Sequence, residues 1–108
     1  MITLAVQPKT MEVLARLRGE TPDEKILALV ESYLSSQIQT CEREIAEYEI
    51  KHRATFADFA EAWAQNQIQG KHTHAIERDY MEWEGLEAEK RQWLAMLKQL
   101  PPNGHDSQ

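Results

Sequence analysis

Several features are scarce in this sequence, and each absence excludes a class of protein. The 108 residues include one cysteine, Cys41, so the chain has no internal disulfide framework and suits a reducing compartment. No apolar run approaches the roughly 18 residues that a membrane-spanning helix needs. The opening residues, MITLAVQPKT, have no cationic segment ahead of their apolar positions, unlike a signal peptide. We therefore expect a cytoplasmic protein without a membrane role.

Motifs for catalysis are missing as well. The sequence has no glycine-rich phosphate loop, no serine nucleophile elbow and no Cys-x-x-Cys pair. His72 and His74 flank a single residue near Glu77, but this spacing is common by chance and we assign no metal to it. We expect no enzymatic activity, no cofactor and no small-molecule substrate. The net charge of -6 also disfavours nonspecific binding to nucleic acid.

The first seven residues predict a strand. Residues 2–7 alternate, with the apolar Ile2, Leu4 and Val6 on one face and a second set, Thr3, Ala5 and Gln7, on the other. A period of two is typical of a strand with one buried face. Because a lone strand leaves its backbone polar groups unpaired, we expect it to pair with the same strand of a second copy. The chain is thus predicted to form a homodimer.

The remainder predicts helices, because helix-forming residue types dominate and proline and glycine number only four each. A short helix is expected over about 9–18, with Gly19 as its cap. Thr21-Pro22-Asp23-Glu24 resembles a capping box and starts a long helix that ends near His52. The apolar stripe of this long helix is Leu27, Val30, Leu34, Ile38, Cys41, Ile45 and Tyr48.

Two further helices are expected in the second half. Thr55 is positioned to cap a short helix over about 56–68, and Thr73 to cap a last long helix over about 74–99. Gly85 interrupts the last helix, where it indicates close packing. We divide the chain into an N-terminal module (1–40), a helical C-terminal region continuous with the long helix (41–100) and a disordered tail (101–108).

The order of a strand, a short helix, a turn and a second helix resembles the ribbon–helix–helix family. Many of its members are antitoxins of bacterial toxin–antitoxin pairs. The residues that carry the likeness are ITLAVQP, MEVLARLRG and GETPDEKILALVESYL, about a third of the chain. The resemblance implies that the outward ribbon residues enter the major groove of operator DNA and that the start of the second helix holds a phosphate. The implied DNA-binding residues are Thr3, Ala5, Gln7 and Thr21.

The second half combines aromatic residues with acidity. After residue 53 there are five basic and nine acidic residues, which suits a basic partner protein. The aromatic side chains either join the helices to one another or anchor a partner, because Trp and Tyr dominate binding hot spots. The candidate partner-binding residues are Tyr48, Phe56, Phe59, Trp63, Tyr80, Trp83 and Trp93.

The resemblance implies an antitoxin-like protein that binds and neutralises a cognate toxin and also binds operator DNA as a dimer. The alternative is a structural or adaptor protein that dimerises through its helices and has no DNA role. The predicted fold is mainly α and ribbon–helix–helix-like, with an N-terminal strand paired across the dimer, followed by a long helix, a short helix and a final long helix.

Overall fold

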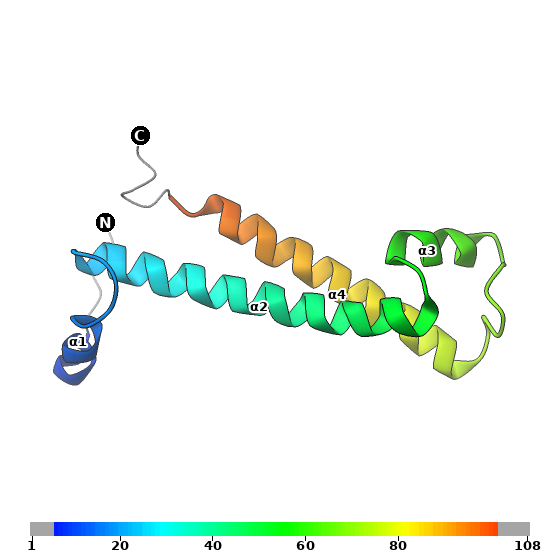
Figure 1. Cartoon of the computed structure of the whole chain (residues 1–108), viewed down its shortest axis with the longest axis horizontal. Helices are drawn as coiled ribbons and strands as arrows, with labels where there is room; N and C mark the ends of the chain where they lie inside the picture. The colour runs from blue at the N-terminus through cyan, green and yellow to red at the C-terminus, as the bar shows by residue number, and fades with distance from the viewer. Residues whose placement is uncertain (1–5, 102–108) are drawn as a thin grey trace.

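The protein is a long helical hairpin with a short helix at each end (Figure 1). The computed structural model describes residues 6–101, and the helices in this range are α1 (Pro8–Leu14), α2 (Pro22–His52), α3 (Phe56–Ala64) and α4 (His74–Gln99). The long helices α2 and α4 are antiparallel and move apart toward the end that carries α1 (Figure 1). We call that end the open end and the α3 end the closed end.

Threonine residues begin three of the helices, as the sequence predicts. The hydroxyl oxygens of Thr21, Thr55 and Thr73 each accept a hydrogen bond from a backbone N–H three residues further on, which satisfies a donor that the first helical turn leaves free. Glu24 does not complete the expected box, because its carboxylate accepts from the backbone N–H of Glu20. The bounds of α2 and α4 confirm the expected long helices.

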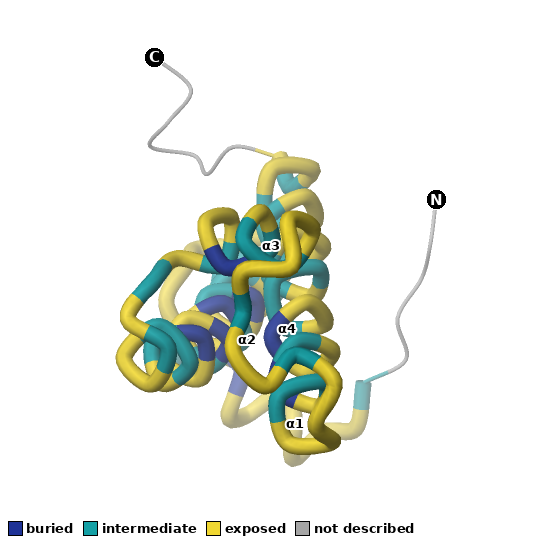
Figure 2. The backbone as a smooth tube through the Cα atoms, turned by 90° about the vertical axis from the view of Figure 1, so that its right-hand side faces the viewer, coloured by how far each residue is buried: buried dark blue, intermediate teal, exposed yellow. Residues whose placement is uncertain are grey.

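The core lies mainly between α2 and α4 and is thickest toward the closed end. The buried α2 positions are Leu34, Ile38, Cys41 and Ile45, the middle of the predicted apolar stripe. On α4 the indole of Trp83 is completely buried, and Phe59 of α3 closes the cluster. Figure 2 shows these buried positions between the helices, whereas most of α1 is exposed.

The predicted N-terminal strand is wrong. The described residues, 6–101, contain no strand, and the described end of the expected one leads directly into α1. Gln7 caps α1: its backbone is extended and its carbonyl accepts a hydrogen bond from the Met11 N–H. The ring of Pro8 favours this extended geometry at Gln7 without any partner strand. Thr3 and Ala5 lie outside the described residues.

Both short helices end earlier than expected, and a lysine holds each turn that follows. The Lys25 ammonium donates to the carbonyls of Leu17 and Gly19 at 2.6 and 2.7 Å, so the segment after Leu14 is folded into turns rather than a helix. Lys71 donates to the Trp63 carbonyl at 2.7 Å after α3 ends. These lysines lie eight residues from the carbonyls of Leu17 and Trp63.

The expectation about Gly85 also needs correction. A Cβ added at Gly85 would meet no atom within 4 Å, so this glycine does not mark close packing. The helix α2 continues through residue 40 without interruption.

Candidate functional site

The closed end gathers six of the seven predicted partner-binding residues into one aromatic cluster. Tyr48 and His52 of α2 stack on Trp83 with ring centroids 5.7 Å apart, and Phe59 lies 5.2 Å away. The remaining members of the cluster are Phe56, Trp63 and Tyr80, which contact Phe59, Trp83 or each other. Because Trp83 and Phe59 are buried, a partner cannot reach them unless α3 moves.

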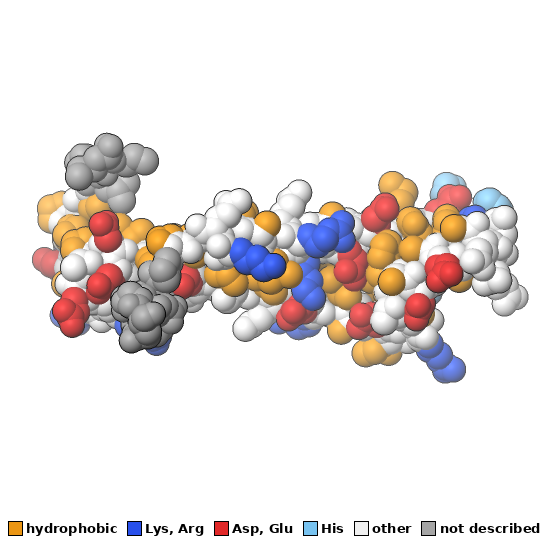
Figure 3. Space-filling model, turned by 90° about the horizontal axis from the view of Figure 1, so that it is seen from above, with side chains coloured by type: hydrophobic (Ala, Val, Ile, Leu, Met, Phe, Trp, Pro, Cys, Tyr) orange, Lys and Arg blue, Asp and Glu red, His pale blue; other side chains and the backbone are white. Residues whose placement is uncertain are grey.

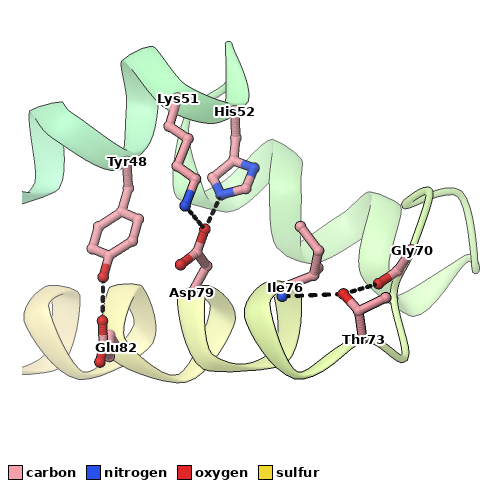
Figure 4. A network of polar contacts seen from close by, with 8 residues as sticks. All are labelled: Tyr48, Lys51, His52, Gly70, Thr73, Ile76, Asp79 and Glu82. Carbon is pink, nitrogen blue, oxygen red and sulfur yellow. Dashed lines mark hydrogen bonds and ion pairs between the residues drawn. The ribbon is translucent and has the colours of Figure 1, made fainter.

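A polar network joins α2 to α4 beside this cluster (Figure 4). The buried carboxylate of Asp79 accepts hydrogen bonds from the Lys51 ammonium at 2.7 Å and from His52 Nε2 at 2.8 Å. One helical turn along, the Tyr48 hydroxyl donates to Glu82. The network therefore fixes the register of the two long helices at the closed end.

These contacts shift two pKa values. Burial raises the pKa of Asp79, but the hydrogen bonds and positive charges of Lys51 and His52 outweigh it and hold that pKa below its ordinary value. The hydrogen bond to Glu82, together with burial, raises the pKa of Tyr48 to about 12. Asp79 therefore stays ionised at neutral pH and Tyr48 stays protonated, which is what a structural bridge between helices requires.

A shallow groove runs along this network between α2 and α4. Most of its polar lining is acidic: the residues are Glu44, Glu47, Tyr48, Lys51, Asp79, Glu82, Gly85, Leu86 and Glu89. Cys41 is buried nearby, and burial raises the pKa of its thiol, so it is a poor nucleophile. Within residues 6–101 no three His, Cys, Asp or Glu side chains gather as a metal-binding set.

Of the four residues implied for DNA binding, two lie within the described structure. Thr3 and Ala5 lie outside the described residues, and Gln7 is the exposed cap of α1. Thr21 is exposed at the start of α2, where the first turn carries Asp23 and Glu24. Two carboxylates at this position oppose a phosphate, so the ribbon site that the resemblance implies is not present in the described structure.

The open end exposes apolar side chains, most of which sequence reasoning did not single out. Val30 is the exception, since it belongs to the predicted apolar stripe but is exposed. Leu29 is 47% exposed, Val30 37%, Tyr33 57% and Met96 46%. The rings of Tyr33 and Trp93 meet edge to face with centroids 5.9 Å apart, which joins the α2 and α4 parts of this surface. We call Leu29, Val30, Tyr33, Trp93 and Met96 the open-end face. Trp93, the seventh predicted partner-binding residue, thus lies apart from the other six.

Few charges lie along the open end of the long helices. Residues 26–41 of α2 include one charged side chain, Glu31, and residues 92–100 include one, Lys98, although 30 of the 108 residues are charged. Hydrophobic side chains reach the surface along the molecule, including its left half in Figure 3. This scarcity of charge is the signal in the sequence that could have located the open-end face.

The comparisons provide no relative from which a function could be transferred. Protein-family models, curated proteins and solved structures gave no match to this chain. Across residues 6–101, no helix has both the length and the apolar character to span a membrane. The chemistry of the two ends of the hairpin is therefore the basis for assigning a function.

Proposed function

We propose that this chain is a helical adaptor that binds a protein partner through its open-end face. The observation that carries the proposal is the exposure of Leu29, Val30, Tyr33 and Met96 on adjoining parts of α2 and α4. Contiguous apolar surface on a soluble protein marks a docking site, because water contact with it is unfavourable. Tyr, Trp and Met are also enriched at the centres of protein interfaces.

The rest of the molecule supports a binding role over chemistry. The aromatic side chains at the closed end pack α3 on the hairpin. The side chains of the polar network beside them form hydrogen bonds and ion pairs with one another. The groove beside it is lined mostly by acidic side chains, and its lining lacks a nucleophile paired with a base. The side chains of the closed end contact one another, whereas the open-end face exposes apolar side chains that a partner would cover. This arrangement supports a docking role.

Site-specific photo-crosslinking in the native cell tests this proposal. A photoreactive phenylalanine analogue would replace Tyr33, and in a second variant it would replace Arg43, which is exposed on α2 away from the face. We expect a discrete crosslinked protein, a second copy included, at position 33 and none at position 43. Equal crosslinking at both positions, or none at 33, would reject the open-end face as a docking site.

Neutralisation of a cognate toxin is one specific form of this proposal, and it rests on the family resemblance. It predicts that the chain purifies from its native cell with a stable small protein whose toxicity it suppresses when the two are coexpressed. Absence of such a companion removes the antitoxin hypothesis and leaves the adaptor. The operator-binding role depended on the ribbon and is not proposed.

A further inference from the structure

We infer that the partner on the open-end face is a second copy of this chain, so that two hairpins form a symmetric four-helix bundle at their open ends. This inference rests on the proposed function, because it names the occupant of the same surface. The predicted dimer contact was a strand; the contact argued here is between helices, and it draws on three independent observations.

The first observation is the width of the apolar arc on both helices. At about 100° per residue, Tyr33 lies roughly 100° around α2 from the buried Leu34, and Met96 lies roughly 140° around α4 from the buried Trp83. The Tyr33–Trp93 contact shows that the two extensions lie on the same side of the hairpin. A helix that packs on one neighbour needs a narrower stripe than this. Each long helix thus has room for a second helical neighbour.

The second observation is the charge of the face. The chain carries a net charge of -6, so most ways of placing two copies together oppose like charges. The parts of α2 and α4 that carry the open-end face are the exception, because Glu31 and Lys98 are the two charged residues within 26–41 and 92–100 and they have opposite signs. A two-fold contact places the same patch on both sides, which requires a self-complementary surface of this kind.

The third observation is the amount of surface. The chain exposes 8502 Å², whereas a folded monomer of its mass exposes about 6,200 Å². Its radius of gyration is 20.1 Å, against about 13 Å for a compact domain of 108 residues. The excess of roughly 2,300 Å² per chain is more than a standard stable interface buries in total. An elongated hairpin thus has enough surface for a contact of the size that a stable dimer needs.

Other partners match the chemistry of the open-end face less well than a second copy does. A basic protein would be drawn to the acidic groove at the closed end rather than to the open-end face, which has few charges. Among the exposed apolar residues outside the open-end face, Met11 and Val13 lie on α1, whereas Ile50 and Met81, 78% and 70% exposed, lie on α2 and α4 toward the closed end. Each of the latter two projects on the far side of its helix from the polar network, since it lies about 200° around the helix from Tyr48 or Asp79.

Sedimentation equilibrium of the purified full-length chain tests the inference, with substitutions chosen among side chains that are already exposed. The test variant is Leu29→Glu with Met96→Glu, and the matched control is Ile50→Glu with Met81→Glu. Both add the same charge, but only the first pair lies on the open-end face. We expect the natural chain and the control to sediment at twice the chain mass, and the test variant to dissociate at least about 100-fold more readily.

Helix content by circular dichroism verifies that each variant is folded. As a measurement that needs no variant, hydrogen exchange should slow within residues 26–37 and 92–100 as the concentration of the natural chain rises. A monomer throughout the concentration range, a higher oligomer, or equal dissociation of both double variants overturns the inference. A monomer whose position 33 crosslinks to a different protein overturns the inference and leaves the adaptor proposal intact.

Discussion

At the scale of the residue, Asp79 shows how this chain keeps a charge inside its core. Burial of an unpaired carboxylate is costly, but Asp79 receives hydrogen bonds from Lys51 and from His52 on the facing helix. Lys51 keeps much of its length in solvent, whereas His52 is enclosed between Trp83 and Phe59. Asp79 of α4 is thus bonded to α2 by one donor that is exposed to solvent, Lys51, and by one that is largely buried, His52.

We predict that Asp79→Asn lowers the free energy of unfolding by about 1–3 kcal/mol at pH 7, because it removes a charge-assisted bridge inside the core. The pKa of Asp79 is lower in the folded than in the unfolded chain, so its contribution is present above the unfolded value, about 3.9, and is lost as pH falls through the folded value. Urea denaturation of both proteins from pH 7 to below pH 4 measures this difference.

The difference between the natural chain and Asp79→Asn should therefore shrink as the solution becomes strongly acidic. Glu84→Gln is a suitable control, because Glu84 is exposed on the same helix and the substitution removes the same charge. A control that loses as much stability as the Asn variant, or a gap that stays constant below pH 4, would contradict the role assigned to Asp79.

At the scale of the element, two glycines differ in the space that a Cβ atom would have. Gly85 lies inside α4 with open space where a Cβ would project. Gly19 precedes α2 with φ +115°, and a Cβ there would lie 3.0 Å from the backbone nitrogen of Lys25. Of these two glycines, Gly19 is the one whose backbone conformation needs a residue without a side chain.

Gly85→Ala should raise the free energy of unfolding by about 1 kcal/mol, because alanine loses less conformational freedom in a helix interior. A rise of several degrees in the thermal midpoint is expected for a chain of this size. Gly19→Ala, the same chemical change, should lower the midpoint. Scanning calorimetry of the two variants beside the natural chain gives the comparison, and a shift of the same sign in both would refute it.

The helix α3 depends on its aromatic contacts for its position. Phe59 touches His52, Trp63, Tyr80 and Trp83, whereas the hydrogen bonds of the α3 side chains stay within α3 and its C-cap, and Lys71 joins its end to the loop that follows. Docking of α3 is thus driven by apolar burial and ring packing, with no polar bond to fix its angle.

Phe59→Ala should release α3 from the hairpin at a cost of about 3–5 kcal/mol. Hydrogen exchange should accelerate over residues 56–64 by more than it does over residues 34–45 of α2. Phe59→Leu keeps most of the buried volume and should show a much smaller effect. Uniform acceleration across α2 and α3 would show that the closed end unfolds as one unit.

The elements that the sequence predicted well are those whose signals are local. Thr21, Thr55 and Thr73 each bond within their own first turn, so their helix starts could be read from neighbouring residues. The alternation over 2–7 predicted a strand, but the pattern does not show where a partner strand would come from. At Gln7 the extended backbone is explained by Pro8 alone. The early ends of α1 and α3 were missed because Lys25 and Lys71 act on carbonyls eight residues away.

The candidate site was predicted in part. The aromatic residues after 55 were recognised, and the structure places most of them in the packing between helices, one of the two interpretations left open. Leu29, Tyr33 and Met96 were overlooked because the sequence does not show whether an apolar residue on a helix packs on a helix of the same chain or of another chain. Their exposure shows that these side chains face solvent, at the end of the hairpin where α2 and α4 diverge (Figure 1).

At the scale of the whole molecule, the distribution of charge decides how association responds to salt. The inferred dimer contact contains few charges, so screening has little to weaken there, while it reduces repulsion between two chains of net charge -6. The dimer should hold or tighten as the ionic strength rises from about 0.05 M to about 0.5 M. Sedimentation across this range measures the trend, and a dimer that dissociates in salt would point to a contact made by ion pairs.

The three tryptophans lie in different environments, so their intrinsic fluorescence reports on different parts of the protein. The indole of Trp83 is fully buried with its N–H unpartnered, Trp63 lies under the Lys71 ammonium, and Trp93 lies on the open-end face. Emission from variants that keep one tryptophan each would therefore separate three events along the hairpin. Trp83 would follow loss of the core, Trp63 the loop after α3, and Trp93 the arrival of a partner, without any dye attached to the chain.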